Sequence, residues 1–141
     1  MSDLTYTTPA GHGQDNLKNY KYNQVVRVGD VLHISGQGGW VYETGVIHEN
    51  IEDQIDQAFA NIDHILKEAG GKGWEQVFRV NSYHIPLDET ALAAMVRNFD
   101  KWMPNHKSLW TCVGVVRLGG GDVMRVEIEV QAYDPQGSKG A

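Results

Sequence analysis

The sequence is poor in cysteine, in long apolar segments and in basic residues. Its one cysteine, Cys112, cannot form an internal disulfide, which is typical of proteins from reducing compartments. No apolar segment approaches the roughly 20 residues that a membrane helix needs. Residues 1–13 also lack the basic and apolar stretches of a secretory signal. We therefore expect a soluble, cytoplasmic protein without a membrane partner.

The shortage of basic residues also bears on possible partners. Lysine and arginine together number 12, against 18 aspartates and glutamates, which gives a formal net charge of −6. Proteins that bind the phosphate backbone of nucleic acids usually show the opposite balance. We expect no nucleic-acid partner.

Motifs for metal and phosphate binding are missing as well. The 6 histidines lie far apart, and the sequence has neither H-E-x-x-H nor a second cysteine. The glycine-rich stretches "SGQGGW" and "LGGGD" lack the strand–loop–helix context of a phosphate-binding loop, so we interpret both as turns. We expect neither a metal nor a cofactor.

The sequence does contain a regular alternation of strand and helix patterns over a length that fits one domain. Two strands with a turn at Gly29-Asp30 are predicted first. The further strands are predicted within 76–85, 108–116 and 123–133. A helix is predicted from Ile51, with Asn50 as its N-cap, to a stop at Gly70-Gly71.

A second helix is predicted between Asp88, its N-cap, and Pro104. The order β-β-α-β-α-β-β favours a two-layer α+β domain with a mixed sheet and both helices on one face. We assign 21–134 to this single domain, 1–20 to an extended N-terminal arm and 135–141 to a loose C-terminal tail. The second helix is expected to bury Leu92, Met95, Val96, Phe99, Trp102 and Met103.

Two helices can cover only one face of the sheet, yet several strands are apolar at nearly every position. Such strands are usually covered on both faces. A second copy of the chain is the simplest cover, so we expect a homo-oligomer. The last strand then turns Glu127, Glu129 and Gln131 toward an intersubunit surface, where a partly buried carboxylate needs a partner or a function.

Several side chains have two interpretations at this point. Glu127 and Glu129 are roughly 7 Å apart on one face of a strand, either as ion-pair partners or with one acting as a proton acceptor. Cys112 has apolar neighbours and no nearby cation, which favours a structural role over a nucleophilic one. Trp40 and Trp110 lie in a loop and at a strand start, where pocket walls are often built.

Five segments in collinear order make the chain similar to one family. They are "YNQVVRVGDVLHISGQ", "IEDQIDQAFANIDHILKEAGG", "VFRVNSYH", "TCVGVVRL" and "MRVEIEVQAYDP". Together they resemble the reactive intermediate deaminase (Rid, or YjgF-type) family, once described as L-PSP endoribonucleases. The resemblance implies a chorismate-mutase-like fold, a homotrimer with clefts between subunits, and cofactor-free hydrolysis of reactive enamines and imines.

The resemblance also implies roles for individual residues. Tyr22 and the backbone around Ser35, Gly36 and Gln37 match the family's substrate-binding positions, and Cys112 matches its pocket cysteine. Glu127 matches the glutamate that positions or activates the attacking water.

One position departs from the family pattern. The family's "P-A-R-S-C" carries an arginine that binds the substrate carboxylate, and here Trp110 stands in its place within "SLWTC". An indole offers one N–H and a π face instead of a charged fork of donors. Lys107 could replace the arginine only with a three-residue shift in the alignment.

We therefore expect a substrate that is flatter or more apolar than an imine derived from a simple amino acid, with Tyr22, Trp40 and Trp110 as walls. The alternative is a trimer that binds a small molecule or a partner segment without catalysis. An endoribonuclease is the least favoured interpretation.

Overall fold

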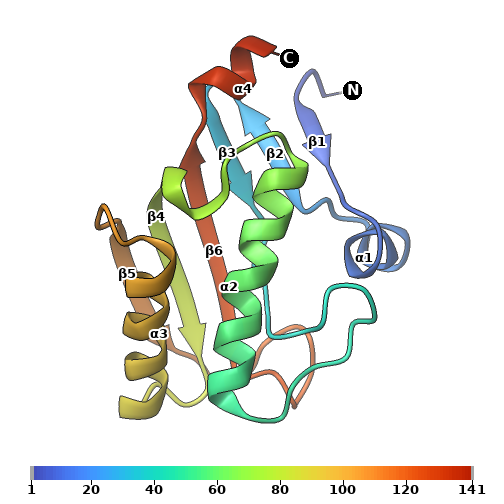
Figure 1. The fold of residues 1–141 in the computed structure, drawn as a ribbon. Coiled ribbons are helices and arrows are strands. Elements are labelled where there is room, and N and C mark those ends of the chain that lie inside the picture. The colour runs from blue at the N-terminus through green and yellow to red at the C-terminus, as the bar shows by residue number, and fades with distance from the viewer. Residues whose placement is uncertain (1, 141) are drawn as a thin grey trace.

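The computed structural model describes residues 2–140, in which six strands form one mixed sheet of order β1-β2-β3-β6-β4-β5. Strand β4 pairs with β5 in parallel, and all other neighbours are antiparallel. The helices α2 and α3 lie side by side on one face of this sheet (Figure 1). The α+β class, the mixed sheet and the placement of both long helices agree with the prediction.

The predicted elements appear with small shifts at their ends. The strands are β2 (Val25–Val28), β3 (Val31–Ile34), β4 (Val77–His84), β5 (Leu109–Gly114) and β6 (Val126–Tyr133). The long helices are α2 (Ile51–Glu68) and α3 (Glu89–Trp102), and a 3-10 turn, Gly73–Gln76, precedes β4.

Both long helices begin where their caps predict. The Asn50 side chain accepts hydrogen bonds from the backbone N–H groups of Glu52 and Asp53. The Asp88 carboxylate accepts one from Ala91 at 2.9 Å. These side chains satisfy N–H groups that have no partner inside a helix, which fixes each start.

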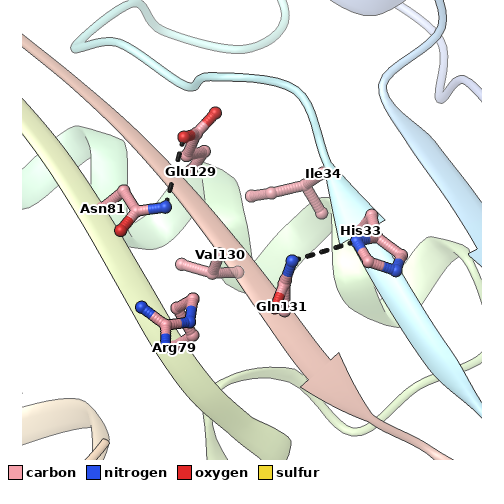
Figure 2. Close-up of a pocket in the computed structure, with 7 residues that line it drawn as sticks. All are labelled: His33, Ile34, Arg79, Asn81, Glu129, Val130 and Gln131. Carbon is pink, nitrogen blue, oxygen red and sulfur yellow. Dashed lines mark hydrogen bonds between the residues drawn. The ribbon is translucent and has the colours of Figure 1, made fainter. Parts of the chain in front are cut away.

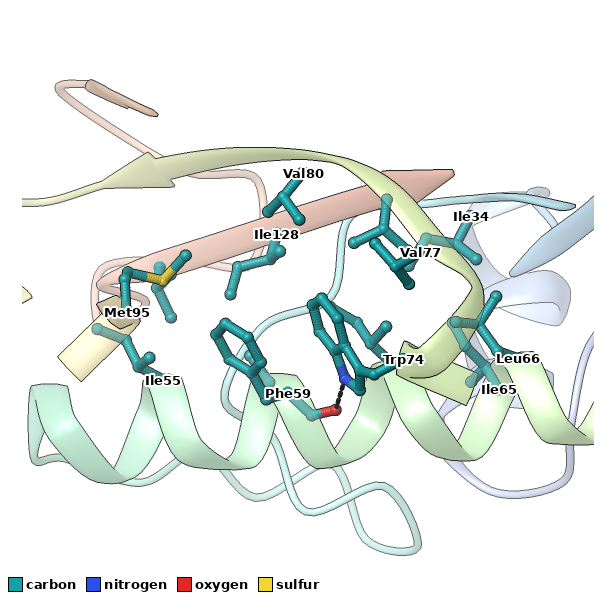
Figure 3. Close-up of a cluster of buried hydrophobic side chains, with 14 of the residues drawn as sticks. Ile34, Ile55, Phe59, Ile65, Leu66, Trp74, Val77, Val80, Met95 and Ile128 are labelled. Carbon is teal, nitrogen blue, oxygen red and sulfur yellow. Dashed lines mark hydrogen bonds between the residues drawn. The ribbon is translucent and has the colours of Figure 1, made fainter. Parts of the chain in front are cut away.

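The core lies between the sheet and the two long helices (Figure 3). Phe59 of α2 stacks on Trp74 with ring centroids 4.5 Å apart, and the Trp74 indole donates to the Phe59 carbonyl at 2.8 Å. Helix α3 buries Met95, but Val96 is 49% exposed, so the prediction that Val96 is buried is wrong. Val96 follows Met95 directly and therefore points about 100° away from the core-facing side of the helix.

The two ends of the chain are more structured than the sequence suggests. The segment 1–20, predicted as an extended arm, contains β1 (Thr5–Thr7), which pairs with β2, and α1 (His12–Tyr20). Segment 135–141, predicted as loose, contains α4 (Pro135–Gly140) within the described part of the chain. Both helices are polar and lack an apolar stripe, which is the signal that marked the longer helices.

Strand β6 runs through the middle of the sheet and alternates strictly. Val126, Ile128 and Val130 are buried beneath the helices, whereas Glu127 and Glu129 point to the opposite face. Apolar side chains remain exposed on the face that carries Glu127 and Glu129: Val28, Leu109, Val113 and Tyr133. The chain alone therefore leaves one face of its sheet uncovered, as the apolar pattern predicts.

Candidate functional site

A cavity of about 410 Å³ lies beside the start of β6. Glu127 of β6, Tyr22 before β2 and Trp40 after β3 line it, so three of the predicted site residues come together. The remaining lining comes from α1 and from two glycine-rich loops: His12, Asn16, Tyr20, Gly45, Ile47, Gly119, Gly120 and Met124. A volume of this size is within the range of small-molecule sites.

Glu127 is half-buried, and its carboxylate forms no ion pair or hydrogen bond with any residue between 2 and 140. Burial, and to a smaller extent the charge of Glu129, raise the pKa of the Glu127 carboxyl. Between residues 2 and 140 no group stabilises its charge, and a carboxyl group with a raised pKa in a cavity is a candidate for proton transfer.

Gly36 lies directly against the Glu127 carboxyl group. A Cβ at this position would overlap the Glu127 side chain. A residue without a side chain is therefore required if the loop is to pass this close to the carboxylate.

Ser35 and Gln37 hold that loop in place. Ser35 Oγ donates to the Asn23 carbonyl at 2.6 Å, and Gln37 Nε2 donates to Gln24 Oε1 at 2.7 Å. The backbones of Gln37 and Ile128 exchange two hydrogen bonds, at 2.8 and 2.9 Å. These contacts make Ser35 and Gln37 positioning residues for Gly36 beside Glu127.

Glu129, two residues further along β6, has a different environment. Its carboxylate accepts hydrogen bonds from the Tyr83 hydroxyl at 2.7 Å and from Asn81 Nδ2 at 3.3 Å. It faces a second, smaller and polar cavity with Arg79 and His33 (Figure 2). The spacing of Glu127 and Glu129 in the sequence could not show which of them is structurally paired. In the structure Glu129 has hydrogen-bond partners and Glu127 does not.

The sequence interpretation missed the contribution of α1. The His12 ring lies over Trp40 with centroids 4.1 Å apart, and His12 Nε2 is 2.8 Å from the Asn16 amide. Burial lowers the pKa of His12, so the ring is neutral at pH 7. His12 and Asn16 are four residues apart, which is the spacing of a side-chain pair on one face of a helix. This spacing is a sequence signal that could have indicated α1.

Trp110, Cys112 and Lys107 lie elsewhere in the chain. Trp110 of β5 points to the helix side of the sheet, where its indole donates to Ser82 Oγ at 2.9 Å and packs edge-on against Phe99 at 5.0 Å. Cys112 is opposite Ser82 in the β4–β5 register and shares that face. Lys107 is exposed, 3.9 Å from Asp100. One chain does not bring them to Glu127, so their substrate contacts remain predictions that require a second subunit.

Two general features complete the description of residues 2–140. In that part of the chain, no group of three or more His, Cys, Asp or Glu side chains is arranged to hold a metal ion. None of its helices is both long enough and apolar enough to cross a membrane.

The fold and the cavity define a small α+β protein with a half-buried, unpaired glutamate in a cavity beside an incompletely covered sheet. The family model described as Endoribonuclease L-PSP matches residues 14–134. The chain belongs to this family, whose relatives also include proteins of the RutC, YjgF and RidA types.

Individual relatives are similar over nearly the whole chain. The RutC family protein YjgH of Escherichia coli K12 is 31% identical over 137 residues, which cover 96% of this chain and 99% of that protein. A solved structure of YjgH superposes with a TM-score of 0.77 at 26% identity, over 94% of this chain and 96% of that one. RidA from an Antarctic Psychrobacter gives a TM-score of 0.73 at 31% identity, over 92% and 95%.

Proposed function

We propose that the protein hydrolyses reactive imines or enamines to a carbonyl compound and ammonia, with Glu127 as the catalytic residue. The observation that supports this most directly is the unpaired Glu127 carboxyl in the cavity, with its raised pKa. A general acid–base catalyst works best when its pKa lies near the working pH, and burial moves the pKa of Glu127 in that direction.

In the proposed reaction, a water molecule held by Glu127 attacks the carbon of the C=N bond. Glu127 takes one proton from the water, and the substrate nitrogen receives a proton as the carbinolamine forms. Transfer of the carbinolamine O–H proton to the nitrogen and cleavage of the C–N bond then release ammonia and leave the carbonyl product. Water is the only co-reactant of the proposed reaction.

We further propose that the working form is a homotrimer whose subunits meet at the open face of the sheet. Exposed apolar residues on that face support this, because Val28 and Leu109 are 44% and 56% exposed in the single chain. Exposed apolar surface of this kind is usual at subunit interfaces. Sedimentation equilibrium should give three times the monomer mass of 15.7 kDa.

Ammonia release from imines generated in the assay by an amine or amino-acid oxidase tests the hydrolase. Glu127→Gln should lower kcat by about 10²–10⁴-fold, because it removes the proton acceptor. Glu129→Gln is the matched control, since it changes a carboxylate on the same face of β6 that already has hydrogen-bond partners. Equal rates for wild type and Glu127→Gln on every imine would contradict the proposal and favour a binding trimer.

The family description, Endoribonuclease L-PSP, suggests RNA cleavage as a second candidate. No lysine or arginine lines the cavity in the described chain, and the net charge is −6. We therefore expect ribonuclease activity to disappear from the preparation on further purification, whereas ammonia release stays constant per milligram.

A further inference from the structure

The Glu127 cavity contains aromatic rings and one carboxylate but no cation. Tyr22 is 37% exposed and Tyr20 is 73% exposed, so both present ring surface at this site. His12 and Trp40 form a close, tilted pair of rings on the α1 side, with centroids 4.1 Å apart. Within residues 2–140, no lysine or arginine side chain lines the cavity.

His12 does not supply the missing positive charge. Burial lowers its pKa, and only the nearby Asp15 acts in the opposite direction. Its Nε2 atom is engaged with the Asn16 amide at 2.8 Å. Asn16 is itself buried. The residues of α1 that line the cavity, His12, Asn16 and Tyr20, therefore supply no fixed positive charge.

These surroundings favour one sign of ligand charge. A substrate carboxylate would have to lie near Glu127 without any counter-ion in the described chain, and burial of such an unpaired pair of like charges is unfavourable. A planar cation would be attracted both to the Glu127 carboxylate and to the faces of the aromatic rings. A protonated imine is itself a planar cation.

We propose that α1 makes this cavity selective for aromatic or heteroaromatic iminium compounds that carry no carboxylate. This inference rests on the proposed function, because it names the substrate class of the same site. The iminium group lies at Glu127, and the attached ring lies between Tyr22 and the His12–Trp40 pair. Selectivity comes from α1 and its contacts, whereas the chemical step depends on Glu127.

Binding of two stable probes tests the inference without turnover. Benzamidine is a planar aromatic cation without a carboxylate, and benzoate has the same ring with the opposite charge. Titration calorimetry on the intact protein should show benzamidine binding about ten-fold or more tightly than benzoate. Glu127→Gln should reduce benzamidine affinity by a similar factor, whereas Glu129→Gln should leave it unchanged.

Variants in α1 test the origin of the selectivity. His12→Arg keeps a planar group that can stack on Trp40 and adds a permanent charge, so it should favour benzoate over benzamidine. Tyr20→Arg adds a charge at an exposed lining position and should shift the preference in the same direction if His12→Arg does not fold.

The outcomes separate this inference from the hydrolase proposal. Equal affinity for benzoate and benzamidine, or benzamidine binding unaffected by Glu127→Gln, would overturn the selectivity. Selective benzamidine binding without turnover of any imine would support the selectivity and contradict the hydrolase. Preferred turnover of imines that carry a carboxylate would support the hydrolase and overturn the selectivity.

Discussion

Two carboxylates at opposite ends of β6 have opposite environments. Asp134, directly after the strand, receives Arg27 Nη2 at 2.6 Å and Gln76 Nε2 at 3.0 Å, and its side chain is 2% exposed. Glu127, near the start of the strand, is half-buried and has no such partner within residues 2–140.

The pKa values of the two groups shift in opposite directions. Burial alone would raise the pKa of Asp134, but the hydrogen bonds from Arg27, Gln76 and the Gly137 N–H outweigh it and lower that pKa. Burial dominates at Glu127 and raises its pKa. The two ends of β6 therefore differ: the charge of Asp134 is stabilised by its partners, whereas burial disfavours the charge of Glu127.

Removal of the paired carboxylate should have the largest effect on stability. Asp134→Ala leaves Arg27 buried without its partner, and we expect a loss of about 3–5 kcal/mol in the free energy of unfolding. Urea unfolding followed by circular dichroism measures this loss. Glu127→Gln is the comparison, and it should be as stable as wild type or slightly more stable at pH 7. Equal losses in both variants would remove the distinction between the two ends of β6.

A side chain at position 36, which would crowd the Glu127 carboxylate, should have the next largest effect on stability. Gly36→Ala forces the Glu127 side chain to move, and we expect a cost of about 1–3 kcal/mol in stability together with loss of ammonia release. Gly119→Ala is the control for the loss of stability, because a Cβ at position 119 meets no atom within 4 Å. If Gly36→Ala retained full activity, Glu127 would not need its present position.

Trp110 and Trp40 show the same difference between a polar group with a partner and one without. The Trp110 indole donates to Ser82, whereas the buried Trp40 Nε1 has no acceptor in the described chain. Trp110→Phe keeps a ring against Phe99 and loses the hydrogen bond, so we expect destabilisation of about 0.5–1.5 kcal/mol with unchanged kcat/KM. A change in kcat/KM without a change in stability would instead support the predicted substrate contact across subunits.

The smallest expected effect is in the pH dependence of stability. Because the native pKa of Glu127 is raised, its contribution to stability falls as pH rises above its ordinary value of 4.5. Because the native pKa of Asp134 is lowered, its contribution is lost as pH falls below its ordinary value of 3.8. Unfolding free energies of wild type and Glu127→Gln between pH 3 and 7 should diverge as pH rises, with the variant the more stable.

Much of the fold could be predicted because the long elements have strong local signals. The apolar stripe of α2, its Asn50 cap and the alternation in β6 each specify one structure. Helix α1 lacks such a stripe and depends on tertiary contacts, chiefly those of His12 with Trp40 and the burial of Asn16. Its position could therefore not be derived from local pattern.

The candidate site was predictable only in part for a similar reason. Glu127, Tyr22 and Trp40 were identified and lie together, but spacing along β6 could not distinguish Glu127 from Glu129. That distinction depends on Tyr83 and Asn81 of β4, which reach Glu129 through the strand register. Such hydrogen bonds join strands that are far apart in sequence, so the sequence of either strand alone does not predict them.

The close contact of Gly36 with Glu127 has a consequence for how this site can change. On that side the wall is backbone that is hydrogen-bonded to β6, so substitutions there alter the Glu127 carboxylate before they alter the ligand. On the other side, α1 supplies the wall from a short surface helix outside the sheet. Under the proposed function, new substrate preferences can therefore arise by replacement of α1 residues, while the proposed catalytic carboxylate stays unchanged.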